Sequence, residues 1–163
     1  MCQVKIHSNY LKNADEIVRL AEQEHGKFSI RAPGHQYNFT TKYGDSKLKS
    51  LFIFDMSDEL KETILKTLSD EDKTADGITL NRYDPGDYLK RHRDSQGGYW
   101  KFKLIFLQSD APHFVWYDTD GTAHAVIETP GDYLEMPIHI DHEITQITEY
   151  ERPKYSLVLS WGI

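Results

Sequence analysis

Cysteine is nearly absent from the sequence: Cys2 is the one cysteine among 163 residues. A framework of intrachain disulfides is therefore excluded, and the chain suits a reducing compartment. The sequence also lacks an apolar run of about 18 residues that could span a membrane. No charged-then-apolar leader opens it. We therefore expect a soluble cytoplasmic protein with no signal peptide and no membrane partner.

Positive charge is also scarce, because 19 Lys and Arg residues stand against 26 Asp and Glu residues, for a formal net charge of -7. Nucleic-acid-binding domains usually carry a basic surface, so we do not expect nucleic acid as a partner. The sequence has no internal repeat and no low-complexity tract. Its length suits one domain with a full core, and we expect residues 1–163 to form that domain.

Two helices are expected in the first half, over residues 13–25 and 57–69. In each, a capping residue (Asn13 or Ser57) precedes acidic residues, and apolar residues recur every third or fourth position. Between the helices, residues 27–50 show no clear period and are rich in Gly, Tyr, Thr and Asn. We expect one or two short strands there, with a loop that covers an active site or forms an irregular packing layer.

The second half changes to short β segments separated by turn signals such as Asp84-Pro85-Gly86 and Pro130-Gly131. The expected strands are residues 78–83, 88–94, 100–108, 114–117, 123–128, 132–135, 143–148 and 155–161. About eight strands at this spacing indicate a sandwich or barrel. We therefore predict a mainly β (α+β) protein, in which an antiparallel β roll over residues 78–163 is supported by helices and a lid region from residues 1–77.

One stretch of the β half has the spacing of metal ligands, because His92 and Asp94 are separated by one residue. On a strand over 88–94, both side chains point to one face. His142 would add a second imidazole, and two histidines with one carboxylate are the ligands of non-haem Fe(II) oxygenases. His139 competes with His142, which we favour because it leads directly into an alternating strand. Taken alone, such a pair more often marks a surface histidine beside an aspartate.

Several short motifs follow one another along the second half of the chain: Tyr83, His92 with Asp94, His142-Glu143-Ile144 and Lys154-Tyr155-Ser156. Their order resembles that of the Fe(II)- and 2-oxoglutarate-dependent oxygenases, and among these it most resembles the prolyl hydroxylases. The resemblance covers residues 78–163. It implies a double-stranded β-helix core of the jelly-roll or cupin type with the N-terminal helices packed outside. It also implies that His92, Asp94 and His142 bind Fe(II), that 2-oxoglutarate and O2 are co-substrates, and that ascorbate is a further candidate cofactor.

The far carboxylate of 2-oxoglutarate needs a cation and hydroxyl donors. Arg152 lies ten residues after His142 and could bind this carboxylate through two hydrogen bonds, although Pro153 follows it. Lys154 matches the basic-x-Ser pattern of the family, and we favour it. Residues 152, 154 and 156 would share one strand face, so alternation does not decide between the two cations. Tyr83 and Ser156 would donate to the co-substrate, or they fill the core.

The leading functional hypothesis is a hydroxylase of a prolyl residue in a peptide or protein. A hydroxylase of a free amino acid or of aspartyl or asparaginyl residues is an alternative, because PGDYLKRHRD, PGDYLEMP and HEI also resemble that group. A non-catalytic, cupin-like module that binds a metal or ligand is the alternative from another class. Repair of alkylated nucleic acid is disfavoured by the acidic charge and by the lack of a second arginine after Arg152.

Overall fold

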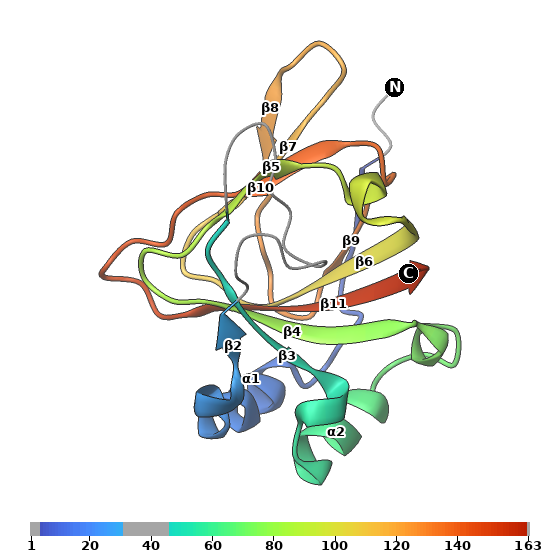
Figure 1. Ribbon diagram of the computed structural model, residues 1–163, viewed down its shortest axis with the longest axis vertical. Helices are drawn as coiled ribbons and strands as arrows, with labels where there is room; N and C mark the ends of the chain where they lie inside the picture. Colours follow the sequence, from blue (N-terminus) through green and yellow to red (C-terminus); the bar gives the residue numbers. More distant parts are fainter. Residues whose placement is uncertain (1–3, 31–45, 163) are drawn as a thin grey trace.

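The computed structural model describes residues 4–30 and 46–162. Within these residues, two antiparallel β-sheets face each other, and two α-helices pack on the outside of the larger sheet (Figure 1). The larger sheet contains, in spatial order, β1 (Lys5–His7), β9 (Tyr133–Glu135), β6 (Tyr99–Gln108), β11 (Lys154–Gly162), β4 (Gly77–Tyr83), β3 (Lys49–Phe52) and β2 (Ser29–Ile30). The smaller sheet contains β5 (Leu89–His92), β10 (Asp141–Ile144), β7 (Phe114–Tyr117) and β8 (Ala123–Ala125). The predicted mainly β, jelly-roll fold is thereby confirmed.

The helices are α1 (Ala14–Gln23) and α2 (Asp58–Leu65), and short 3-10 helices span His25–Lys27, Ile53–Asp55, Asp72–Thr74 and Asp94–Gly97. Ser57 caps α2 as predicted, since its hydroxyl accepts a hydrogen bond from the Leu60 N–H. Asn13 instead donates its side-chain amide to the Thr63 carbonyl and so links the two helices. The predicted end of the second helix at residue 69 is wrong, because α2 ends at Leu65.

Alternation along β11 separates the outer core from the interior between the sheets. Tyr155, Leu157 and Leu159 are fully buried against the helices. Val158 and Ser160 point the other way and line a cavity between the sheets. Strand β4 is sorted in the same manner, with Ile78 and Leu80 in the outer core and Thr79, Asn81 and Tyr83 lining the cavity. Alternate residues of these two strands thus form the interface with the helices and the wall of the cavity.

The first half of the chain contributes more than helices, because β1, β2 and β3 complete both edges of the larger sheet. Gly131 helps to fix this arrangement. Its N–H donates to the Phe106 carbonyl at 2.7 Å, and its own carbonyl accepts from the Leu11 N–H at 2.9 Å. Its φ of 90° lies in the left-handed region that favours glycine.

Residues 31–45, which make up most of the segment 27–50 that was predicted to cover an active site, lie outside the described residues. In the part of the chain that the structure describes, no helix is both long and apolar enough to cross a membrane.

Candidate metal centre

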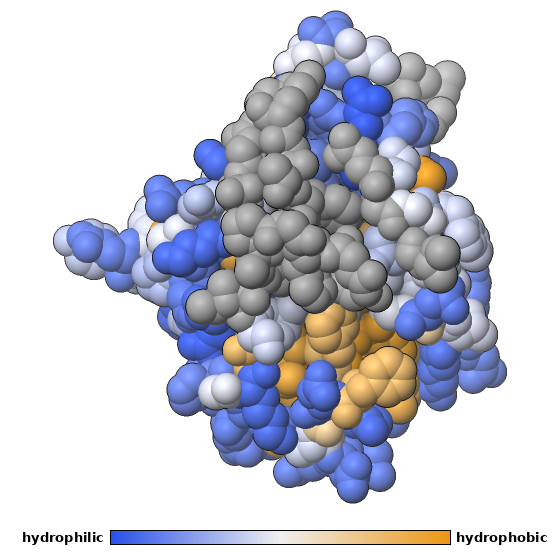
Figure 2. Space-filling model, viewed as in Figure 1, coloured by the Kyte–Doolittle hydropathy of each residue, from blue (hydrophilic) through white to orange (hydrophobic). Residues whose placement is uncertain are grey.

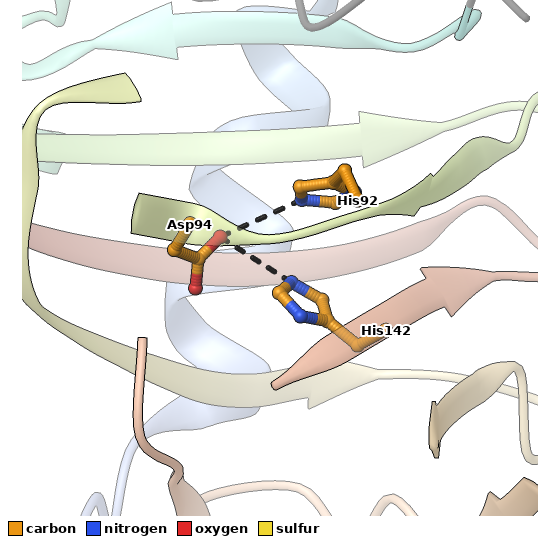
Figure 3. Close-up of side chains that lie close together, drawn as sticks. All are labelled: His92, Asp94 and His142. Carbon is orange, nitrogen blue, oxygen red and sulfur yellow. Dashed lines mark ion pairs between the residues drawn. The ribbon is translucent and has the colours of Figure 1, made fainter. Parts of the chain in front are cut away.

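Three buried side chains converge, two from strands of the smaller sheet and one from the segment that follows β5 (Figure 3). His92 ends β5, and His142 lies directly opposite it on β10. Asp94 begins the 3-10 helix that follows β5. Its Oδ1 atom lies 3.5 Å from Nε2 of His92 and 3.3 Å from Nε2 of His142. One ligand atom from each residue lies within 4.8 Å of the others.

The convergence was predicted, but the reason given for Asp94 is wrong. The strand that was expected to run to residue 94 ends at His92, so Asp94 does not share a strand face with it. Instead, the turn into the 3-10 helix brings the carboxylate back towards the two imidazoles. His142 lies within β10, which begins at Asp141 rather than at the predicted residue 143. His139 lies in the preceding turn and is exposed.

Backbone carbonyls fix the orientation of both imidazole rings. Nδ1 of His92 lies 2.7 Å from the Lys90 carbonyl oxygen, and Nδ1 of His142 lies 3.0 Å from the Ile140 carbonyl oxygen. Because a carbonyl accepts and never donates, each Nδ1 carries the hydrogen. In the neutral ring, Nε2 then directs its lone pair towards Asp94. Two lone pairs and a carboxylate at this separation repel one another unless a cation or a proton lies among them.

The electrostatics of the cluster agree with this geometry. Burial alone would raise the pKa of Asp94, but the imidazoles of His142 and His92 outweigh burial and hold it well below its usual value. Burial and the neighbouring His142 lower the pKa of His92. Burial opposes the charged form of His142, yet the Asp94 carboxylate raises its pKa. The site therefore stabilises positive charge beside Asp94, a role that a divalent cation fulfils on binding.

Two imidazoles and one carboxylate fit a non-haem Fe(II) ion, which would keep coordination positions open. The three residues form part of the wall of a cavity of about 480 Å³ between the sheets. Apolar side chains form much of the rest of this wall: Leu48, Leu89, Leu104, Phe114, Leu134 and Ile144. Phe54 also lines the cavity and is 84% exposed. Figure 2 shows apolar side chains at the surface beside the end of β3.

The predicted co-substrate residues lie along the same inner face. Lys154 is opposite Tyr83, and Ser156 is opposite Asn81, across the β11–β4 pair. All three predicted residues are buried. Tyr83 lines the cavity, whereas Lys154 and Ser156 continue the inward row of β11 beyond its lining residues.

Arg152 does not belong to this group. It precedes the first residue of β11, so the predicted shared face of residues 152, 154 and 156 is wrong. Its Nε and Nη2 atoms donate to Oδ1 of Asp110 at 2.9 and 2.7 Å. The Arg152 side chain is 65% exposed. Pro153 separates it from the strand, which is the boundary that the sequence had indicated.

Glu128 is a residue at this site that the sequence analysis missed. The Nζ atom of Lys154 donates to Oε1 of Glu128, and the two side chains are 2% and 1% exposed. Burial lowers the pKa of Lys154 to about 7. A signal was available, because alternation places Glu128 on the same side as buried Val126, while Ile127 between them is 82% exposed. An acidic residue at an inward position needs a buried partner.

Comparisons with known proteins agree on the fold. No family model and no curated protein match the sequence. Among solved structures, a Pseudomonas putida prolyl-4-hydroxylase has a TM-score of 0.64 at 17% identity, over 98% of this chain and 92% of that one. A Burkholderia pseudomallei oxidoreductase of the 2OG-Fe(II) oxygenase family has a TM-score of 0.68 at 14% identity, over 98% and 84%.

A Trichoplax adhaerens prolyl hydroxylase, solved with a peptide fragment of the hypoxia inducible factor oxygen degradation domain, has a TM-score of 0.69 at 13% identity, over 98% and 83%. The chain therefore has the fold of the prolyl-hydroxylase-like 2OG-Fe(II) oxygenases, as its motifs predicted.

Proposed function

We propose that the protein is an Fe(II)- and 2-oxoglutarate-dependent dioxygenase that hydroxylates a C–H bond of its substrate. The observation that carries this proposal is the convergence of His92, Asp94 and His142 on the wall of the cavity between the sheets, with their ligand atoms within 4.8 Å of one another. The shared fold supports it independently. Because one fold can host several functions, the proposed function depends more on the site than on the fold.

In this proposal His92, Asp94 and His142 bind the metal, and the Lys90 and Ile140 carbonyls hold the two imidazoles in the metal-binding tautomer. When bound, Fe(II) would supply the activation of O2, with 2-oxoglutarate as the source of electrons. The remaining work belongs to the chain. Its apolar walls exclude water from the reacting atoms, and its inner face supplies polar groups to the co-substrate.

Lys154 is the proposed partner of the distal carboxylate of 2-oxoglutarate, with Tyr83 and Ser156 as hydroxyl donors on the same face. Arg152 is not proposed for this role, because Asp110 holds it at the surface. Replacing Arg152 with Ala therefore serves as a control in any measurement of 2-oxoglutarate affinity.

A prolyl residue of a peptide or protein is the substrate that we propose. Support comes from the Trichoplax neighbour, which was solved with a peptide, and from exposed aromatic side chains near the cavity. Phe54 at the cavity is 84% exposed, and Trp100, which directly follows the cavity residue Tyr99, is 64% exposed. Aromatic faces favour packing against a flat, apolar ring. Free amino acids and aspartyl or asparaginyl residues belong in the same substrate panel.

Metal binding is the first test. Anaerobic Fe(II) titration should show one ion per chain, and His92→Ala, Asp94→Ala and His142→Ala should each weaken binding by about 100-fold or more, since even changes behind the ligands cost 10–100-fold. His139→Ala is the matched control, because this exposed histidine lies three residues from His142 but outside the cluster. Unchanged metal content in the three ligand variants would reject the assignment.

A binding module without turnover is the second candidate function, and one observation favours it: Lys154 is already paired with Glu128 inside the barrel. The two candidates differ in the products that they predict. An oxygenase loaded with Fe(II) converts 2-oxoglutarate to succinate when supplied with its substrate and O2. A protein that binds the metal but forms no succinate with peptides, free amino acids or oligonucleotides is a binding module.

A further inference from the structure

Glu128 and Lys154 form an ion pair that is sealed inside the barrel. Their side chains are 1% and 2% exposed, and Nζ of Lys154 donates to Oε1 of Glu128. The same Nζ lies 5.5 Å from the ring centroid of Phe106, which belongs to the core cluster between the two sheets. Whichever of the two groups holds the shared proton, the pair as a whole is electrically neutral.

Glu128 is held firmly in this position by the backbone. Its second oxygen, Oε2, accepts hydrogen bonds from the N–H groups of His113 at 2.6 Å and Phe114 at 3.2 Å. These groups lie at the start of β7, in the sheet that carries the metal centre. One carboxylate therefore satisfies two backbone donors and one ammonium group, so it is a built part of the interior and not a mobile surface acid.

Lys154 lies at the end of the row that leads out of the cavity. The inward side chains of β11 run from Ser160 and Val158, which line the cavity, through Ser156 to Lys154. Tyr83, directly opposite Lys154, also lines the cavity. Among the described residues that line it, none is a lysine or an arginine. An anionic ligand in this part of the cavity has Lys154 as its nearest available cation along the row.

A second carboxylate at Lys154 would create a charge imbalance. The neutral pair would become one ammonium group with two carboxylates, and like charges in a buried site strongly disfavour one another. The incoming carboxylate and Glu128 therefore compete for the same Nζ atom. A ligand without a charge at that end meets no such competition.

We propose that Glu128 is a specificity-determining residue that competes with the distal carboxylate of 2-oxoglutarate for Lys154, so that the co-substrate binds only by displacing it. This inference rests on the proposed oxygenase function. In the wild-type protein, the Glu128 carboxylate therefore weakens the binding of 2-oxoglutarate. It does not weaken the binding of a 2-oxo acid whose distal end is uncharged.

The test compares two 2-oxo acids on Mn(II)-loaded protein, because Mn(II) occupies Fe(II) sites without supporting turnover. 2-Oxopentanoate matches 2-oxoglutarate in chain length but has a methyl group in place of the distal carboxylate. Dissociation constants are measured by calorimetry for the wild type and for Glu128→Gln. The variant should bind 2-oxoglutarate about tenfold more tightly or better, since one removed like-charge contact corresponds to at least one decade of affinity. Its affinity for 2-oxopentanoate should stay within about twofold.

Two further variants complete the design. Glu151→Gln removes another largely buried carboxylate, one that binds the His113 ring, and it should change neither constant. Glu128→Asp keeps the charge but draws it back from Lys154, and it should tighten 2-oxoglutarate by a smaller factor. If Glu128→Gln fails to fold, the affinities of Glu128→Asp for 2-oxoglutarate and 2-oxopentanoate are compared with those of the wild type in the same way.

The outcomes separate the two proposals. If both 2-oxo acids bind the wild type and the Glu128 variants with unchanged preference, Glu128 does not determine specificity, although the oxygenase function stands. If neither acid binds any metal-loaded variant, the proposed function fails and this inference fails with it.

Discussion

Replacement of Lys154 by Met tests how the interior of the barrel is held together. Methionine has a similar length and no charge, so the change removes the ammonium group and leaves the Glu128 carboxylate buried at 1% exposure. Removing one partner of a buried ion pair costs about 3–5 kcal/mol. Glu128 keeps its hydrogen bonds from the His113 and Phe114 N–H groups. We therefore expect the free energy of unfolding to fall by about 3 kcal/mol, the lower end of this range.

This loss is large against the total stability of a domain, which is about 5–15 kcal/mol. For a chain of this length, each kcal/mol shifts the melting temperature by about 2–4 °C, so Lys154→Met should melt about 6–12 °C below the wild type. Urea unfolding followed by circular dichroism and by tryptophan fluorescence gives the free energy directly, and coincident curves establish a two-state transition.

The double variant Lys154→Met with Glu128→Gln provides the control. Glutamine keeps an oxygen for the two backbone donors, and no charge remains in the interior. We expect the double variant to be more stable than Lys154→Met alone, with a coupling energy of about 2 kcal/mol between the two sites. A Lys154→Met protein that loses less than about 1 kcal/mol, or a double variant whose loss is the plain sum of the single losses, would refute the buried pair as described.

Two further predictions concern stability away from the site. Lys49 and Arg82 outweigh burial and lower the pKa of Asp84; the stability that this carboxylate contributes is present above its unfolded pKa of about 3.9 and is lost as pH falls through its lower folded pKa. Asp84→Asn should thus destabilise at neutral pH, with an effect that shrinks below about pH 4 and disappears below the lower folded pKa, as followed by urea unfolding across pH; a constant difference would contradict this. Gly131→Ala should cost more than Gly86→Ala in the same assay, because both have positive φ but a Cβ at 131 would lie 2.3 Å from the Leu11 carbonyl oxygen, whereas none is within 4 Å at 86; equal losses would argue against that close contact.

The fold was predictable because apolar and small polar residues alternate along parts of its strands. Ser156 separates Tyr155 from Leu157, and Ser160 separates Leu159 from Trp161; such a period indicates a strand without any knowledge of its neighbours. Strand ends were less predictable. The chain leaves β5 at His92, two residues before the predicted end, because the geometry of the turn and its tertiary contacts decide where pairing stops.

The candidate site was predictable where motif order carried the information. His92, Asp94 and His142 are brought together as their order in the sequence predicted, although alternation gave a wrong reason for Asp94. Glu128 could not be assigned in the same way. Its partner Lys154 lies 26 residues further along the chain, on β11 of the larger sheet, and no local pattern reports such a distant pairing.

The direct opposition of His92 and His142 across β5 and β10 links metal binding to the pairing of these two strands. The pairing of these strands shifts register between His142 and Ile144, so the hydrogen-bonded ladder is interrupted immediately beside the two imidazoles. An ion bound by both rings would cross-link the two strands at the place where their ladder is interrupted. The same cation would then serve the reaction and stabilise the four-stranded sheet, so the rigidity of the sheet would depend on whether the metal is bound.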